Sequence, residues 1–111
     1  MRIQGVLAQA TVRDEGRAER WYSALFGRPP DDRPMPGLLE WHFGNDAGLQ
    51  VWAEAGRAGD STVVLDVDDL DAVAGHLHTI GLGDHSPGQA RSSRILPIED
   101  PDGNRIVFTG P

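Results

Sequence analysis

The stretch Glu99-Asp100-Pro101-Asp102-Gly103-Asn104-Arg105-Ile106-Val107-Phe108 lies near the end of the chain and decides how the rest of the sequence is interpreted. Pro101 presets a backbone φ angle suited to a turn, and Gly103 accepts the geometry with which the turn ends. From Arg105 to Phe108, the Ile and Phe side chains alternate with Arg and Val, as a half-buried strand requires. The stretch therefore predicts a tight turn that leads into a strand.

Length and composition exclude several classes of protein. A chain of 111 residues corresponds to one domain, and without cysteine it has neither disulfides nor zinc–thiolate sites. All ten basic residues are arginine, which excludes Schiff-base chemistry, and the net charge of -7 opposes binding to nucleic acid or anionic lipid. No apolar stretch is long enough to span a membrane, and the start of the chain has no signal-peptide pattern. We expect a cytoplasmic protein without nucleic-acid or membrane partners.

The first half of the chain predicts a strand, a helix and two further strands. Apolar side chains alternate with others from Val6 to Arg13, and Asp14 can cap the helix that follows. The helix has one apolar stripe and ends at Gly27. Four prolines between residues 28 and 37 leave little room for a strand. Two strands are then predicted over residues 38–43 and 49–53.

The second half repeats this order. A strand over residues 62–67 precedes a helix that Asp68 or Asp69 caps and Gly81 ends, and a polar loop from Gly83 to Arg94 leads to the strand at 95–98 and the final hairpin. The helix caps, Asp14 and Asp69, are 55 residues apart, and the helix ends are 54 residues apart. These near-equal offsets predict an internal duplication. We divide the single domain, 1–111, into modules 1–54 and 61–111, joined by a linker at 55–60.

Three motifs at the expected spacing resemble the vicinal oxygen chelate superfamily, which includes glyoxalase I, extradiol dioxygenases and bleomycin-resistance proteins. They are Trp21-Tyr22-x-x-Leu25-Phe26-Gly27, Val67-Asp68-Asp69-Leu70-Asp71-Ala72, and the run from Asp100 to Ile106. The resemblance covers nearly the whole chain. It implies an α+β fold in which two βαβββ modules form a curved mixed-sheet cup. Helices would cover the convex side, and the ligand would lie in the concave side.

The resemblance also implies four metal-ligand positions, one on each of four strands, which are typically His or Gln, Glu, His and Glu. In this sequence they are Leu7, Gln50, Thr62 and Val107. Leu and Val have no donor atom, Thr is a poor neutral ligand, and one Gln alone does not hold a catalytic cation. A shift of one residue would move each position onto the helix-packed face. We therefore expect no metal and no other cofactor.

Other candidate ligands do not form a site either. His76 and His78 are two positions apart on a helix, about 200° around its axis, so their side chains do not converge. The acidic cluster at residues 66–71 lacks the glycine and terminal Glu of an EF-hand loop, and a helix cap with a solvated turn explains it better.

The side chains expected to line the cup are those that alternate with the helix-packed ones. With Phe43 paired to Leu49, His42 faces the cup, whereas a slip of one residue would exchange it with Trp41. The predicted ligand-binding set mixes apolar, aromatic and polar side chains, as small-molecule sites do. It consists of Leu7, Gln9, His42, Gln50, Trp52, Thr62, Val64 and Val107.

Some of these residues have a simpler structural interpretation. Trp52 either stacks on a planar ligand or fills the core. His42 either acts in binding or is a hydrogen-bonded strand histidine. Arg94 and Arg105 either bind an anionic group at the mouth of the pocket or, as we favour, are surface arginines.

Three functions remain open at this point. The first is a metal-free binding protein that holds an aromatic or polycyclic molecule, as bleomycin-resistance-type relatives sequester drugs. The second is a glyoxalase-like lyase or dioxygenase with a non-standard site. The third is a metal-free enzyme in which Glu40 or Asp66, with a raised pKa beside apolar walls, acts as a base near His42. The missing metal ligands favour the first function and argue against an enzyme.

The resemblance also bears on assembly. Relatives with two modules often form homodimers, sometimes by exchanging modules, so that each cup borrows strands from both chains. We therefore expect a homodimer that binds a small molecule, and the sequence does not separate the two arrangements.

Overall fold

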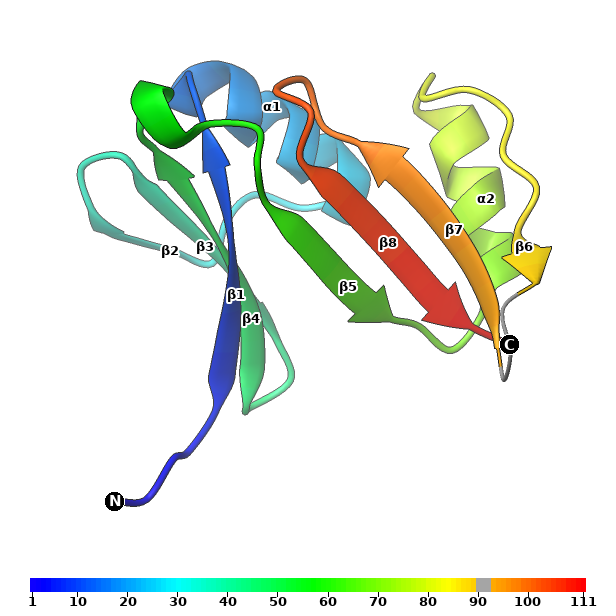
Figure 1. Ribbon diagram of the computed structural model, residues 1–111, viewed down its shortest axis with the longest axis horizontal. Helices are drawn as coiled ribbons and strands as arrows, with labels where there is room; N and C mark the ends of the chain where they lie inside the picture. The colour runs from blue at the N-terminus through cyan, green and yellow to red at the C-terminus, as the bar shows by residue number, and fades with distance from the viewer. Residues whose placement is uncertain (90–92) are drawn as a thin grey trace.

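The computed structural model describes residues 1–89 and 93–111, and these residues form two four-stranded mixed sheets with two α-helices. The first sheet contains, in spatial order, β1 (Val6–Val12), β4 (Ala47–Ala53), β3 (Leu38–Phe43) and β2 (Asp32–Met35). The second contains β5 (Thr62–Asp66), β8 (Arg105–Gly110), β7 (Arg94–Glu99) and β6 (Gly88–Gln89). In each sheet the first two strands of this order are parallel and the other pairs antiparallel. The predicted α+β fold is confirmed, and the two sheets lie side by side without closing (Figure 1).

Both helices begin at the predicted caps and lie on the same side of the sheets (Figure 1). The Asp14 carboxylate accepts a hydrogen bond from the backbone N–H of Arg17 at 2.8 Å, and α1 (Glu15–Phe26) follows it. Asp69 caps α2 (Leu70–Thr79) in the same way. A short 3-10 helix, η1 (Ala55–Arg57), precedes β5. No helix among the described residues is long and apolar enough to cross a membrane.

The pairing of β3 with β4 differs from the prediction by two residues. Phe43 pairs with Ala47 instead of Leu49, so β4 begins earlier and the connecting turn is shorter. A shift of two residues keeps every side chain on its predicted face, because the side-chain period of a strand is two. His42 is exposed and Trp41 is buried, as the predicted facing requires.

Two short strands occur where only loops were expected. β2 lies in the proline-rich segment and contains Pro34. Pro34 is tolerated because β2 is an edge strand, where proline's missing N–H need not face a partner. β6 lies within the predicted loop from Gly83 to Arg94, and residues 90–92 of that loop lie outside the described residues.

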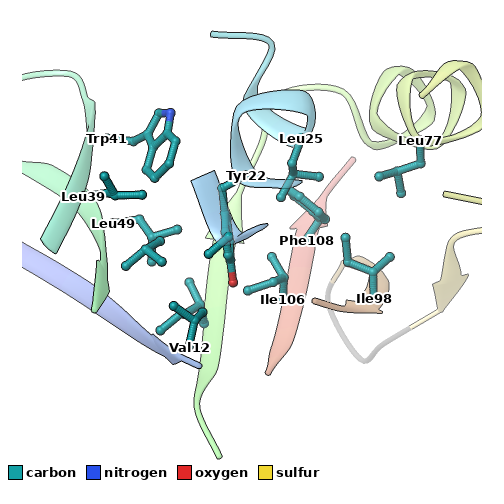
Figure 2. Packing of buried hydrophobic residues seen from close by; sticks show 14 of the residues in the cluster. Val12, Tyr22, Leu25, Leu39, Trp41, Leu49, Leu77, Ile98, Ile106 and Phe108 are labelled. Carbon is teal, nitrogen blue, oxygen red and sulfur yellow. The ribbon is translucent and has the colours of Figure 1, made fainter. Parts of the chain in front are cut away.

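One hydrophobic core joins the helices to both sheets. Tyr22 of α1 is fully buried at its centre (Figure 2). Side chains of the first sheet lie on one side of its ring and those of the second sheet on the other. The neighbours labelled in Figure 2 are Leu39, Trp41 and Leu49 from the first sheet, and Ile106 and Phe108 from the second. The alternating burial of β8 confirms the strand predicted after the turn.

The turn from Asp100 to Asn104 connects the two sheets. The buried Asp100 carboxylate accepts a hydrogen bond from the Tyr22 hydroxyl at 2.6 Å. Burial, and then the nearby Asp100 charge, raise the pKa of Tyr22, so its hydroxyl keeps the proton it donates. The buried Asn104 amide donates to the Thr11 carbonyl of β1 at 2.8 Å and accepts from the Ser61 N–H at 2.9 Å. The turn motif that suggested the fold thus holds the two halves of the chain against each other.

Candidate functional site

The strand register places three rows of side chains on the face of the first sheet that points away from α1, here called the open face. The first row contains Leu7, Gly48 and His42. The second row contains Gln9, Gln50 and Glu40. The third row contains Thr11, Trp52 and Leu38. Five residues of the predicted ligand-binding set therefore lie together on one surface.

The second row forms a chain of hydrogen bonds across three strands. Gln9 Nε2 donates to Gln50 Oε1 at 3.0 Å, and Gln50 Nε2 donates to Glu40 Oε2 at 2.8 Å. The other Glu40 oxygen, Oε1, lies 2.8 Å from His42 Nε2. The hydrogen bonds from Gln50 and then His42 hold the pKa of Glu40 below its usual range. The expectation of a raised pKa at Glu40 is wrong, because these donors stabilise the carboxylate more than burial destabilises it.

The loop before β2 holds His42 in position through its backbone. The Asp31 carboxylate accepts a hydrogen bond from the His42 N–H at 2.6 Å, and Arg28 donates to the His42 carbonyl at 2.6 Å. Arg28 also forms an ion pair with Asp31, which lowers the pKa of that carboxyl group. The His42 imidazole is left on the open face, and its side chain is 46% exposed.

A cavity of about 360 Å³ lies where the first row meets the chain of hydrogen bonds. It is lined by residues 5–7, Glu40, His42 and residues 44–47. Gly48 allows Leu7 to lie across β4 beside this cavity, because a Cβ atom at position 48 would come within 2.9 Å of Leu7 Cδ2. The cavity is therefore lined both by apolar side chains, among them Leu7, and by the hydrogen-bonding side chains of Glu40 and His42.

Trp52 flanks the chain of hydrogen bonds on the other side. Its ring is partly exposed and does not belong to the hydrophobic core, and its indole N–H donates to Glu54 at 3.4 Å. Core filling, the simpler interpretation of this residue, does not describe its position.

The other three residues of the predicted set lie on the second sheet. Val64 and Val107 are cross-strand partners, Thr62 lies two residues before Val64 on β5, and the Val64 side chain is 61% exposed. Because the two sheets do not close, these residues form a second surface beside the open face. Arg94 forms an ion pair with Asp71 at 2.7 Å, which agrees with its interpretation as a surface arginine.

The four metal-ligand positions implied by the resemblance do not fit a metal ion. Leu7 and Val107 offer no donor atom, and the Gln50 amide is already engaged with Gln9 and Glu40. Among the described residues, no group of three or more His, Cys, Asp or Glu side chains is placed to hold a metal. His76 instead lies 2.9 Å from the Leu25 carbonyl at the end of α1, a structural contact between the helices.

The sequence offered Glu40 only as a candidate base near His42 and left it out of the ligand-binding set, and it indicated no role for Asp31 or Arg28. The alternation of β3 was the only available signal for Glu40, and it does not reveal which side chains meet across strands. The cross-strand pairing of Glu40 with Gln50 appears only once the register is known.

Solved structures with the same fold cover nearly all of the chain. A glyoxalase/bleomycin resistance protein from Catenulispora acidiphila is 28% identical, with a TM-score of 0.85 over 96% of this chain and 97% of that one. TnmS3, an antibiotic binding protein from a Streptomyces species, is 26% identical, with a TM-score of 0.76 over 100% and 96%. A bleomycin-binding protein complexed with bleomycin is 22% identical, with a TM-score of 0.75 over 97% and 98%.

No protein-family model matches the sequence, and no curated protein matches it either. The structural comparisons confirm the resemblance to the vicinal oxygen chelate superfamily, because the glyoxalase/bleomycin resistance protein from Catenulispora acidiphila shares the fold over almost its full length.

Proposed function

We propose that this protein, which shares the fold of the glyoxalase/bleomycin resistance proteins, binds an aromatic or polycyclic small molecule without a metal ion and acts by sequestering it. The observation that carries the proposal is the open face itself. It pairs a partly exposed Trp52 outside the core with a hydrogen-bonded polar row and an adjoining cavity. Such a mixture of apolar surface and few directed polar groups is typical of small-molecule sites.

The residues present favour binding over the chemistry of metal-dependent relatives. Two of the four implied ligand positions have aliphatic side chains, so no donor set remains to hold a catalytic cation. A base at Glu40 is also disfavoured, because its lowered pKa makes the carboxylate a weak proton acceptor. The antibiotic binding of TnmS3 and the bleomycin bound to another neighbour support a drug-like ligand for this chain.

The test is titration of the purified protein with bleomycin and with antibiotics that contain fused aromatic rings, followed by tryptophan fluorescence. We expect at least one compound to quench the fluorescence saturably. Isothermal titration calorimetry, which does not depend on the tryptophan, should then show that Trp52→Leu weakens its binding about tenfold or more, as loss of an aromatic hot spot does. Trp21→Phe, which alters a tryptophan on the helix side, is the matched control. Chelator treatment should leave binding unchanged. Binding that disappears with the chelator and returns with a divalent metal would refute the metal-free proposal.

We further propose that a second copy of the chain covers the sheet edges at β1 and β5, so that the protein is a homodimer. Val6 and Leu7 of β1 and Val64 of β5 are 72%, 48% and 61% exposed, so both sheet edges carry uncovered apolar side chains. β1 and β5 stand at the edges of their sheets, and β5 also borders an apolar groove of about 440 Å³ lined by Phe26, Phe43, Ala47 and residues 64–67. One self-complementary contact would cover both edges.

Light scattering coupled to size-exclusion chromatography tests the assembly. We expect a dimer for the wild type and a monomer for Val64→Arg, because the new charge would be buried in the contact. Ala72→Arg, on the exposed side of α2, should remain dimeric. A monomeric wild-type protein at all concentrations would overturn the proposal for assembly without affecting the one for ligand binding.

A further inference from the structure

The open face presents hydrogen-bond acceptors, and the cause is the position of Glu40 in the middle of the polar row. An ionised carboxylate only accepts hydrogen bonds, so each neighbour must turn a donor toward it. Gln50 therefore points its NH₂ group at Glu40 and its carbonyl oxygen at Gln9. Gln9 in turn directs its NH₂ group inward, which leaves its own oxygen at the outer end of the chain.

The same argument fixes the tautomer of the His42 imidazole. His42 Nε2 lies 2.8 Å from Glu40 Oε1, and an ionised carboxylate only accepts, so the tautomer that fits this contact has its proton on Nε2 and leaves Nδ1 as an acceptor. Among the described residues, neither His42 Nδ1 nor Gln9 Oε1 makes a further hydrogen bond. A carboxylate has about four acceptor positions, of which Gln50 and His42 occupy two.

These acceptors lie between two apolar features of the open face. The cavity, which Leu7 also lines, is on one side, and Trp52 is on the other. Glu40, His42 and Leu7 all line the cavity of about 360 Å³. Asp32 lies directly across from Glu40 on β2 and adds a second carboxylate at the same level. A ligand that fits this surface needs an apolar or planar body and a group that donates hydrogen bonds and carries positive charge.

From this arrangement we propose that the open face recognises an organic cation with N–H donors, such as an amidinium or a protonated amine on an aromatic ring, and that Glu40 binds the donor group. The proposal rests on the proposed function and names its ligand class. Gln50, Gln9 and His42 are positioning residues that hold Glu40 ionised and aimed at the face. The ring of the ligand would contact Leu7 or Trp52.

Three small probes distinguish the effect of positive charge from the effect of N–H donors. Benzamidine is a planar cation with N–H donors, benzamide is its neutral counterpart, and phenyltrimethylammonium is a cation without N–H groups. Binding is followed by NMR through the Trp52 indole N–H and the side-chain amides of Gln9 and Gln50. We expect benzamidine to bind about tenfold more tightly than either comparison probe, because only benzamidine combines N–H donors with a positive charge in its hydrogen bond to Glu40.

The variant Glu40→Gln keeps the shape of the side chain and should remove the preference for benzamidine while leaving the weak binding of benzamide within about twofold. Glu99→Gln, an identical change on an exposed position of β7, should keep the preference and so controls for net charge. Equal affinities for the three probes, or equal losses in the two variants, would overturn the inference.

The outcome also distinguishes this inference from the proposed function. If a neutral polycyclic compound quenches Trp52 but benzamidine shows no preference, the face binds small molecules and the cation assignment is wrong. If no probe or antibiotic perturbs the open face, both proposals are wrong.

Discussion

Replacing Asn104 with alanine removes the side chain that ties the final hairpin to the first sheet. Three hydrogen bonds are lost: from Asn104 Nδ2 to the Thr11 carbonyl, from the same group to the Asp100 carboxylate, and from the Ser61 N–H to Asn104 Oδ1. A neutral hydrogen bond contributes about 0.5–1.5 kcal/mol and one to a charged group about 1.5–3 kcal/mol. The expected loss for Asn104→Ala is therefore about 2.5–6 kcal/mol in the free energy of unfolding.

This is a large fraction of the roughly 5–15 kcal/mol that stabilises a typical domain. Denaturation in urea, followed by circular dichroism, measures the loss at constant m value. The control is Asn45→Ala in the exposed turn between β3 and β4, where we expect a change within about 0.5 kcal/mol. If Asn104→Ala costs no more than Asn45→Ala, the hairpin does not hold the two sheets together and the reasoning fails.

Three further changes test the same structure. Tyr22→Phe removes a buried hydroxyl bonded to a carboxylate, and should lower the free energy of unfolding by about 1.5–3 kcal/mol in the same urea assay. Gly59→Ala should lower Tm markedly in a thermal melt, because its φ is +93° and a Cβ atom would lie 2.4 Å from a carbonyl oxygen, whereas Gly56→Ala, which meets open space, should not. Finally, the lowered pKa of Glu40 means that its ionised form stabilises the fold above the unfolded-state pKa of about 4.3. The stability advantage of the wild type over Glu40→Gln should therefore fall as pH drops through the folded-state pKa, and a difference that stays constant from neutral to strongly acidic pH would contradict the hydrogen-bonding pattern at Glu40.

Sequence patterns predicted those features that depend on residues close together in the chain. Asp14 and Asp69 were recognisable as caps because a capping carboxylate bonds to a backbone N–H only three residues away. Leu7 and Val107 were also recognisable as positions without a donor atom for a metal ion, because that conclusion needs only the identity of each side chain. β2 was not predicted, because whether a proline can be tolerated depends on whether its strand lies at the edge of a sheet.

The alternation of polar and apolar residues determined which side chains face the helices and which face outward, since that period is a property of the strand itself. Only the tertiary structure decided which of the outward side chains meet. Phe43 pairs with Ala47, two residues from the expected partner, and such a shift keeps every face but changes every neighbour. The hydrogen bond from Asn104 to Thr11 joins residues 93 positions apart, and the chain of hydrogen bonds from Gln9 to His42 spans three strands. Contacts of this kind depend on register and on the packing of distant segments, which no local period encodes.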